Sequence, residues 1–289
     1  MTASTLVVGT GYTGLRLLRR LPADTGRGLS RSVPAGAGDF CIDKLNLDSP
    51  GTEVELSLPA DYAIVYTVPP ARDAEHDRRL EALLSALTPA PRRFVYLSTT
   101  GVYGDRQGET VTETDPPRPE TARARRRVAA ENALGRWSKN SATEIVILRV
   151  PGIYGPDRVM IDRVRSREPL IQDGEANPGN RIHVEDLVTA CLAGLNSETP
   201  AGIYNLGDGD LRSSTWFSET VAKLLGLPPP PTLSRHEAQT RFSERRLSFL
   251  NESRRIDTQK MRRTLGVTPR YADAADGIRA SLTEMGLLA

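Results

Sequence analysis

Cysteine, histidine and long apolar runs are scarce in this sequence, and each shortage excludes a class of protein. Only two cysteines and three histidines occur among 289 residues, so we expect neither a disulfide framework nor a metal site. Cys41 and Cys191 are interpreted as buried thiols. No apolar run approaches the roughly 20 residues that a membrane span requires. The chain enters an apolar strand without a basic and apolar leader, so we expect a cytoplasmic protein with no membrane partner.

Excess charge of one sign is also missing. The net charge is only +2, so no overall field attracts the protein to nucleic acid or to an anionic membrane. The basic residues are instead concentrated locally, at residues 120–134 (ETARARRRVAAENAL) and at residues 235–263. No helix-turn-helix or RNP-type aromatic motif accompanies either cluster. We therefore expect no nucleic-acid partner, and a solvated helix face is the simplest interpretation of each basic run.

The sequence does contain a regular alternation of short apolar runs and helical patterns. Runs typical of buried strands occur at residues 5–9, 27–31, 40–43, 61–68, 92–99, 144–150 and 202–207. Leucines recur at helical spacing in residues 15–21 and 80–87. Strands that alternate with helices indicate β-α-β units, so the predicted fold is α/β, a Rossmann-type doubly wound parallel sheet.

The pattern loosens after Pro151, which suggests a second, smaller lobe. Residues 1–155 are predicted to form the dinucleotide-binding core, completed by about residues 180–208. Residues 156–179 and 209–289 are predicted to form a smaller substrate-side lobe. Within that lobe, Ser213 or Ser214 is expected to cap a helix that ends near Gly226.

A glycine-rich turn lies between the first strand and the first helix and reads G-x-G-x-x-G. Gly9 suits a tight turn, Gly11 lets the backbone approach a pyrophosphate, and Gly14 allows close packing of helix on strand. The helix N-terminus at Tyr12 and Thr13 adds amide donors and the positive end of the helix dipole. In this strand–turn–helix context the motif predicts a dinucleotide site.

The end of the second strand bears on which dinucleotide is bound. An NAD-specific site usually has Asp or Glu there, whereas this sequence reads Ser30-Arg31-Ser32 with no carboxylate until Asp39. Arg31 between two hydroxyls suits the 2′-phosphate of NADP. The alternative is a solvated loop arginine. NADP is therefore the expected cofactor, with NAD left open.

Six segments together resemble the extended short-chain dehydrogenase/reductase proteins of the NAD-dependent epimerase/dehydratase type. In chain order they are VVGTGYTG, FVYLSTTGVYG, ILRVPGIYGP, RIHVEDLV, IYNLGDG and TLGVTPRY. The resemblance implies an NAD(P)-dependent oxidoreductase or epimerase, a small-molecule substrate and a homodimer. The glycine spacing departs from the G-x-x-G-x-x-G of most extended members, which points to the atypical subgroup.

The resemblance also implies roles for single residues. Thr99 lies where the family has its catalytic Ser or Thr hydroxyl, Tyr154 lies in the segment that passes the nicotinamide, and His183 borders the active-site cleft. These three are the candidate catalytic residues. Further cofactor contacts implied in this way are Asn46 and Leu47 beside the adenine, and Val68 and Pro69 along the cofactor.

The arginine stretch at residues 120–134 resembles the family's Tyr-x-x-x-Lys helix. Counting back from Val128-Ala129-Ala130-Glu131 places Arg123 at the tyrosine and Arg127 at the lysine. A guanidinium stays protonated and cannot act as the acid or base. The resemblance then implies that Arg127 contacts the cofactor, and that Arg123, Arg254 and Arg255 bind an anionic or nucleotide-linked substrate.

Two functions stay open at this point. The first is an NADP(H)-dependent oxidoreductase or epimerase that uses a non-standard proton donor. The second is a non-catalytic NADP(H)-binding redox sensor or scaffold, which the loss of the Tyr/Lys pair favours.

Overall fold

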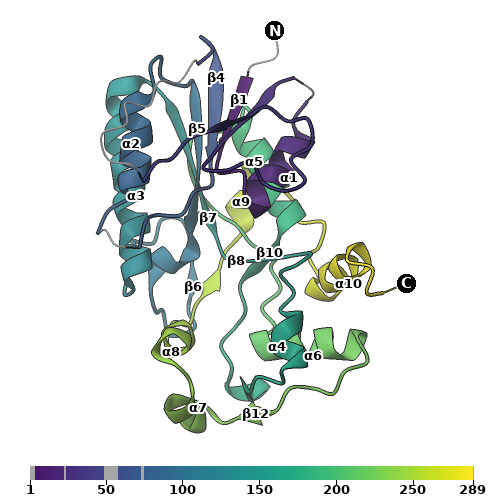
Figure 1. Ribbon diagram of the computed structural model, residues 1–289. Helices are drawn as coiled ribbons and strands as arrows, with labels where there is room; N and C mark the ends of the chain where they lie inside the picture. The colour runs from purple at the N-terminus through teal and green to yellow at the C-terminus, as the bar shows by residue number, and fades with distance from the viewer. Residues whose placement is uncertain (1–3, 23, 49–57, 73–74, 289) are drawn as a thin grey trace.

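Seven strands form one parallel sheet in the order β11-β7-β5-β4-β1-β2-β3 (Figure 1). The computed structural model describes residues 4–22, 24–48, 58–72 and 75–288. The strands are β1 (Ser4–Val8), β2 (Gly26–Ser30), β3 (Ile42–Lys44), β4 (Tyr62–Tyr66), β5 (Arg93–Thr99), β7 (Glu144–Val150) and β11 (Gly202–Asn205). Each overlaps one of the apolar runs, so the predicted Rossmann-type fold is confirmed.

The strand order reverses direction at β1, which lies between β2 and β4. From β1 the chain first builds outwards through β2 and β3, and then returns to build β4, β5 and β7 on the other side. At such a switch point the connections leave the carboxyl ends of the two central strands in opposite directions. A crevice therefore opens there, and this is where doubly wound proteins bind their ligands.

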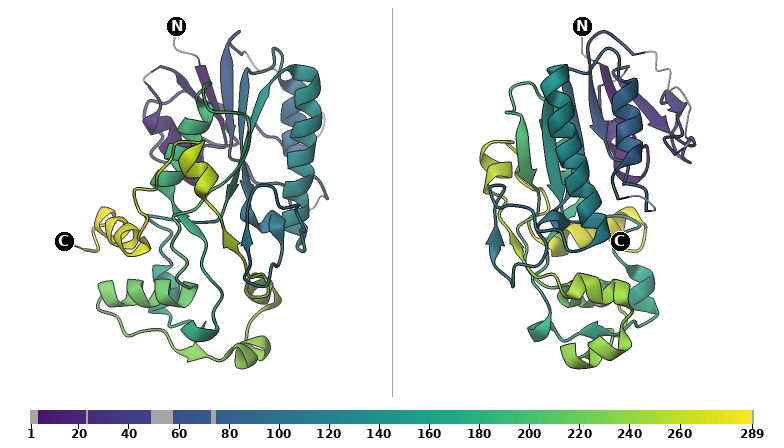
Figure 2. Two further views of the ribbon diagram at one scale, coloured as in Figure 1. Left: turned by 180° about the vertical axis from the view of Figure 1, so that it is seen from behind. Right: turned by 90° about the vertical axis from the view of Figure 1, so that its left-hand side faces the viewer.

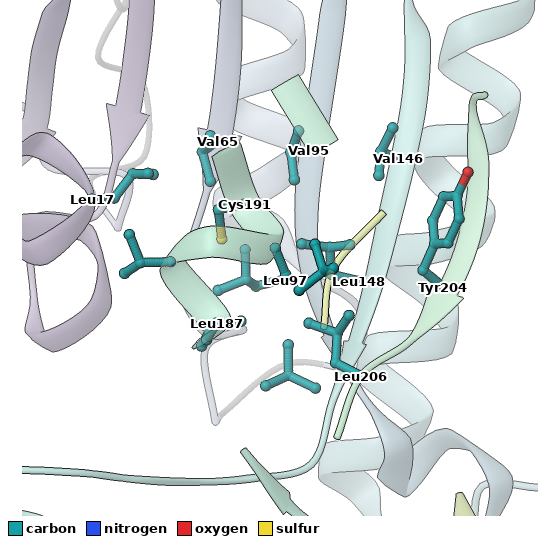
Figure 3. Packing of buried hydrophobic residues seen from close by; sticks show 14 of the residues in the cluster. Leu17, Val65, Val95, Leu97, Val146, Leu148, Leu187, Cys191, Tyr204 and Leu206 are labelled. Carbon is teal, nitrogen blue, oxygen red and sulfur yellow. The ribbon is translucent and has the colours of Figure 1, made fainter. Parts of the chain in front are cut away.

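Helices cover both faces of the sheet, because alternate strand residues point to opposite sides. Helices α1 (Tyr12–Arg20) and α5 (Val184–Leu195) pack against one face, and α2 (Arg78–Ala86) and α3 (Ala122–Ser141) against the other (Figures 1 and 2). Along β4, Val65 belongs to the first apolar cluster and Ile64 to the second. Figure 3 shows the first cluster, where Cys191 of α5 lies among Val65 and Val95.

The two cysteines differ in exposure, which corrects one prediction. Cys191 is fully buried, as expected, whereas Cys41 is exposed. Cys41 directly precedes β3, the last strand of the sheet, so only one neighbouring strand is available to cover it. The apolar residues around Cys41 in the sequence gave no sign of this edge position.

The smaller elements lie mainly beyond the carboxyl edge of the sheet (Figure 2). They are η1 (Thr100–Tyr103), β6 (Thr110–Val111), β8 (Gly152–Tyr154), α4 (Ile161–Arg165), β9 (Leu170–Ile171), η2 (Asp173–Glu175), β10 (Arg181–His183), α6 (Ser214–Leu224), β12 (Thr232–Leu233), α7 (Arg235–Arg241), α8 (Glu244–Leu250), β13 (Arg255–Ile256), α9 (Gln259–Arg263) and α10 (Ala274–Glu284). Apolar side chains of α4, α6 and α10 form a separate cluster. Of the two predicted caps, Ser213 is the one that caps α6.

The C-terminal segment returns to the sheet after building the smaller lobe. Met261, Leu265 and Val267 join the cluster that also contains α1 and α5. This packing favours a dinucleotide-binding core that includes C-terminal residues outside its predicted boundaries. The division of the chain into two lobes stays a prediction. Among the described helices, none is long and apolar enough to cross a membrane.

Candidate functional site

A cleft of about 500 Å³ opens at the switch point of the sheet. The glycine loop, the ends of β2 and β5, the loops after β3 and β4, helix α3 and the segment after β7 all contribute to its walls. Segments that are spread over residues 8–158 of the chain therefore converge in one place.

The three glycines of the loop have different surroundings, which explains why each position lacks a Cβ. Gly9 has a φ of +92°, and a Cβ there would lie 2.6 Å from the hydroxyl of Thr67. A Cβ on Gly14 would lie only 2.0 Å from the carbonyl oxygen of Gly9. By contrast, within the described residues no atom other than those of its two chain neighbours lies within 4 Å of the Cβ position of Gly11. Gly9 and Gly14 thus serve the packing of the loop, whereas Gly11 leaves space that a ligand can occupy.

The N-terminus of α1 is suited to bind an anion. Gly11 is its N-cap, so no side chain accepts a hydrogen bond from the first amides, and the first turn carries no acidic residue. Unsatisfied amides and the helix dipole both favour a negative group at such a position. The loop therefore fits the pyrophosphate of a dinucleotide, as the sequence predicts.

The end of the cleft beside β2 and β3 carries three charged side chains. Ser30, Arg31 and Leu47 line it as predicted, and Asp48 and Arg79 line it as well. Arg31 is largely exposed, and its guanidinium lies 3.6 Å from the Asp48 carboxylate. Arg79 donates two hydrogen bonds to that carboxylate, of 2.5 and 2.7 Å, and the pKa of Asp48 is lowered by this contact.

Sequence reasoning missed this carboxylate because it looked for an acidic residue only after the second strand. Asp48 follows the third strand, and a parallel sheet brings the ends of β2 and β3 together. The predicted Ser32 and Asn46 do not line the cleft. The side chain of Asn46 instead accepts a hydrogen bond from the backbone of Asp48, which shapes the turn.

The other end of the cleft lies beside β4, β5 and β7. Val68 and Pro69 line it as predicted, together with Ile153. Arg127 reaches the cleft from α3, because its guanidinium donates hydrogen bonds of 2.9 Å to the Tyr96 hydroxyl and to the carbonyl oxygen of the following residue, Leu97. Arg123, one turn earlier on the same helix, is half-buried and does not line this cleft.

Two adjacent hydroxyls at the end of β5 have different positions. Ser98 lines the cleft, and its hydroxyl donates a short hydrogen bond to Glu131 of α3. Thr99 was predicted as the catalytic hydroxyl, but it does not line the cleft. Its side chain caps η1 by accepting a hydrogen bond from the amide of Gly101, at 3.1 Å.

A buried charged network lies behind Ser98. Glu131 accepts two hydrogen bonds from Arg149, of 2.7 and 3.2 Å, and both side chains are at least 90% buried. Arg149 also donates to the Tyr103 hydroxyl at 2.8 Å, which in turn donates to Asn205 at 2.7 Å. The network ties α3 to β7, β11 and η1, and it holds the Ser98 hydroxyl in place.

Tyr154 and His183, two of the predicted catalytic residues, do not line the cleft. The two rings pack edge to face with their centroids 5.2 Å apart, and Tyr154 also contacts Phe217 of α6. His183 caps α5, because its Nδ1 accepts a hydrogen bond from the amide of Glu185, while its Nε2 lies 3.1 Å from the Ser281 hydroxyl. Both ring nitrogens thus have partners within the protein. The sequence placed His183 at a strand end but did not show that a helix begins at the next residue.

Burial keeps His183 neutral, and this has a consequence for stability. Burial lowers the pKa of His183 to about 4, and Arg16 and Arg270 add to the effect. Because the folded-state pKa lies below the ordinary value of about 6.5, the stability that neutral His183 contributes is complete above pH 6.5 and is lost as the pH falls towards 4.

We expect the stability advantage of the wild type over His183→Asn to shrink by about 2 kcal/mol between pH ~7.5 and pH ~5. Asparagine is a good N-cap but does not titrate in this range. Urea unfolding at several pH values measures the difference. His236→Asn is the matched control for the same substitution at an exposed position. A flat profile for the His183 variant would contradict a buried, neutral imidazole.

Two of the three arginines predicted to bind substrate, Arg254 and Arg255, are engaged with a loop. Arg254 donates hydrogen bonds to the carbonyl of Gly104, at 2.7 Å, and to Glu252, at 2.9 Å. Arg255 donates to the carbonyl of Gly108, and its strand β13 pairs with β6. They therefore fix the loop that follows η1, and neither lines the cleft at the switch point.

Sequence reasoning also missed Arg158, which lines the cleft although it follows β8. Its guanidinium carbon lies 4.0 Å from the centre of the Tyr12 ring. The local sequence GPDRV gives no signal of this contact, because the two residues meet only through the fold.

Comparisons with known proteins agree with this architecture. Residues 73–207 match the model of the NAD dependent epimerase/dehydratase family. The chain is 30% identical over 242 residues to the protein YeeZ of Escherichia coli K12, covering 78% of this chain and 84% of YeeZ. A functionally unknown conserved protein from Silicibacter pomeroyi is also 30% identical, with a TM-score of 0.83 over 98% of this chain and 99% of that one.

A more distant structure shares the fold. It is the UDP-glucuronic acid 4-epimerase from Bacillus cereus in complex with UDP-glucuronic acid and NAD. The two chains are 18% identical, with a TM-score of 0.74 over 98% of this chain and 99% of the epimerase.

Proposed function

The chain belongs to the NAD-dependent epimerase/dehydratase family, and we propose that it is an NAD(P)-dependent oxidoreductase or epimerase that acts on a small anionic or nucleotide-linked substrate. The observation that carries the proposal is the open space beside Gly11 at an uncapped helix N-terminus. A bound dinucleotide supplies hydride transfer at its nicotinamide. The chain itself has to bind it, orient it and handle the proton.

The cleft offers a place for each part of the cofactor. The amides of Gly11, Tyr12 and Thr13 are suited to the pyrophosphate. Ser30, Arg31 and Leu47 would hold the adenosine end, and Val68 and Pro69 would run along the cofactor. Ser98, Arg127 and Ile153 would surround the nicotinamide riboside. All of these residues line the cleft.

The substrate class is proposed from charge and from relatives. In the solved Bacillus cereus epimerase the ligand is UDP-glucuronic acid, an anionic sugar nucleotide. In this chain Arg123 lies on α3 one turn from Arg127, which itself lines the cleft. We propose that Arg123 and Arg127 occupy the positions of the family's Tyr and Lys, and that Arg123 favours an anionic substrate. A homodimer and a cytoplasmic location stay predictions.

A second candidate function is a redox sensor that binds the cofactor without turnover. It is favoured because three side chains of the cleft that carry donor hydrogens already make hydrogen bonds within the protein. The Ser98 hydroxyl donates to Glu131, and the guanidinium of Arg127 donates to the Tyr96 hydroxyl and the Leu97 carbonyl. The Tyr12 phenol donates to the carbonyl of Pro156, and burial raises its pKa to about 12. Oxidation of NADPH by this protein with any member of a panel of carbonyl compounds and sugar nucleotides would exclude the sensor.

Calorimetric titration with NADPH and, separately, with NADH tests the dinucleotide site directly. Binding of either cofactor supports the proposal and identifies the partner to use in the substrate search. If neither cofactor binds, the enzyme and the sensor are both excluded, because each requires an occupied cleft.

The proposed preference for NADP rests on Arg31. Replacement of Arg31 should therefore weaken the binding of only one of the two cofactors. We expect Arg31→Ser to weaken NADPH binding about tenfold and to leave NADH binding nearly unchanged, because only NADPH carries the 2′-phosphate. Arg19→Ser is the matched control, since Arg19 donates to the Gly36 carbonyl and does not line the cleft. An equal loss for both cofactors would show that Arg31 does not read the 2′-phosphate.

A further inference from the structure

The segment that follows β8 has an unusual backbone. Gly155, Asp157 and Met160 have φ angles of +148°, +64° and +57°, so three of six consecutive residues lie in the positive-φ region. For a residue other than glycine this conformation is uncommon and costs free energy, and it persists where the surrounding structure enforces it. Such backbone is concentrated at ligand-binding segments. This segment also contains Arg158.

Tyr12 fastens the segment to the glycine loop. Its hydroxyl donates a hydrogen bond of 2.7 Å to the carbonyl of Pro156, across 144 positions of the chain. A Cβ on Gly155 would lie 2.6 Å from the same hydroxyl, so the missing side chain allows the close approach. The segment and the loop that is suited to the pyrophosphate are thus held together by one side chain.

Arg16 and Arg158 both contact the Tyr12 ring, and they differ in the hydrogen bonds and ion pairs that their guanidinium groups make. Arg16 lies 4.2 Å from the ring centre, donates to the carbonyl of its own helix, and is 3.7 Å from Glu185. Arg158 lies 4.0 Å from the ring centre and is exposed. In the described part of the chain its guanidinium has no hydrogen bond or ion pair in addition to this ring contact. Only Arg158 lines the cleft.

The helix N-terminus alone does not balance the negative charge of a pyrophosphate at this point of the cleft. A dinucleotide pyrophosphate carries about two negative charges, whereas a helix N-terminus is equivalent to only about half a positive charge. Arginine presents several donors in a planar fork that matches phosphate oxygens, and stacking on an aromatic ring keeps that fork oriented. Arg158 lies over the ring of Tyr12, the residue between Gly11 and Thr13, and it lines the same cleft as these residues.

We infer that Arg158, stacked on Tyr12, binds the pyrophosphate of the dinucleotide together with the N-terminus of α1. The inference rests on the proposed function, because it requires a dinucleotide in the cleft. The segment after β8 thereby has a binding role of its own, separate from the roles of the glycine loop and of the arginines of α3.

The test is calorimetric titration of the wild type and Arg158→Gln with NADPH, NADH and ADP-ribose. All three ligands contain the pyrophosphate, and ADP-ribose lacks the nicotinamide. We expect the variant to bind each of them about tenfold more weakly, by a similar factor, since one charged hydrogen-bonding group is lost. The affinity of the variant should also depend less on salt concentration than that of the wild type.

Arg16→Gln is the matched control, because it removes an arginine from the same ring but not from the cleft. It should change the three affinities less than about threefold, and thermal melting of both variants checks that they fold. Unchanged ADP-ribose binding by Arg158→Gln would overturn the inference. So would a loss confined to NADH and NADPH, which would place the guanidinium at the nicotinamide. If the wild type binds none of the ligands, the proposed function itself fails and the inference with it.

Discussion

Replacement of Gly11 by valine is expected to weaken the binding of NADH and NADPH at least about a hundredfold, roughly 3 kcal/mol, without a change in thermal stability. Apart from the two chain neighbours of Gly11, no atom of the described residues lies within 4 Å of its Cβ position, and its φ of −78° lies outside the left-handed region. The new side chain therefore enters only the space suited to the pyrophosphate. Titration calorimetry measures the loss, and thermal melting measures the stability.

Two further glycine variants serve as comparisons for Gly11→Val. Gly174→Val is the matched control, since its Cβ position is also open and Gly174 does not line the cleft. It should bind both cofactors like the wild type. Gly14→Ala should instead lower stability, because its Cβ would lie 2.0 Å from the backbone oxygen of Gly9. Normal cofactor binding by a folded Gly11→Val protein would exclude the glycine loop as the pyrophosphate site.

Replacement of Glu131 by glutamine should lower the free energy of unfolding by about 3–5 kcal/mol. Arg149 is only 2% exposed, and Glu131 is the only carboxylate with which it makes an ion pair among the described residues. Removing one charge leaves the other buried and uncompensated, which costs more than the pair itself contributes. Urea unfolding at neutral pH measures the change.

The double variant Glu131→Gln/Arg149→Met should recover most of this loss, because neither charge of the pair then remains. Glu168→Gln is the matched control for the same substitution at the surface. Its partner Arg163 lies 2.9 Å away, but both side chains are more than 40% exposed, so the expected loss is below about 1 kcal/mol. A similarly small loss for Glu131→Gln would mean that water reaches the buried pair.

The sequence alone predicted the elements of the sheet and the position of the glycine loop. Those features depend on neighbours a few residues apart. Short continuous apolar runs identified strands such as Phe94–Leu97, and the spacing of Leu80, Leu83 and Leu84 identified a helix. The loop was recognised because a strand, three glycines and a helix follow one another directly.

The lining of the cleft was predicted only in part. Val68 lines the cleft because the ends of parallel strands meet at one edge of the sheet, and Arg127 reaches the cleft from α3. His183 and Thr99 do not, because each side chain turns back to cap the helix that begins at the next residue. A strand pattern shows where a strand ends but not the direction in which the last side chain points.

What the sequence determined by itself is the order of strands and helices, the apolar faces by which they pack, and the turn at Gly9, Gly11 and Gly14. Only the tertiary structure decided which distant side chains share the cleft. It brought Arg158 to Tyr12 and Asp48 to Arg31, and it exposed Cys41 at the sheet edge. The physical reason is that the hydrophobic pattern fixes which side of an element is buried, whereas the paths of the connecting loops depend on contacts between residues far apart in the chain.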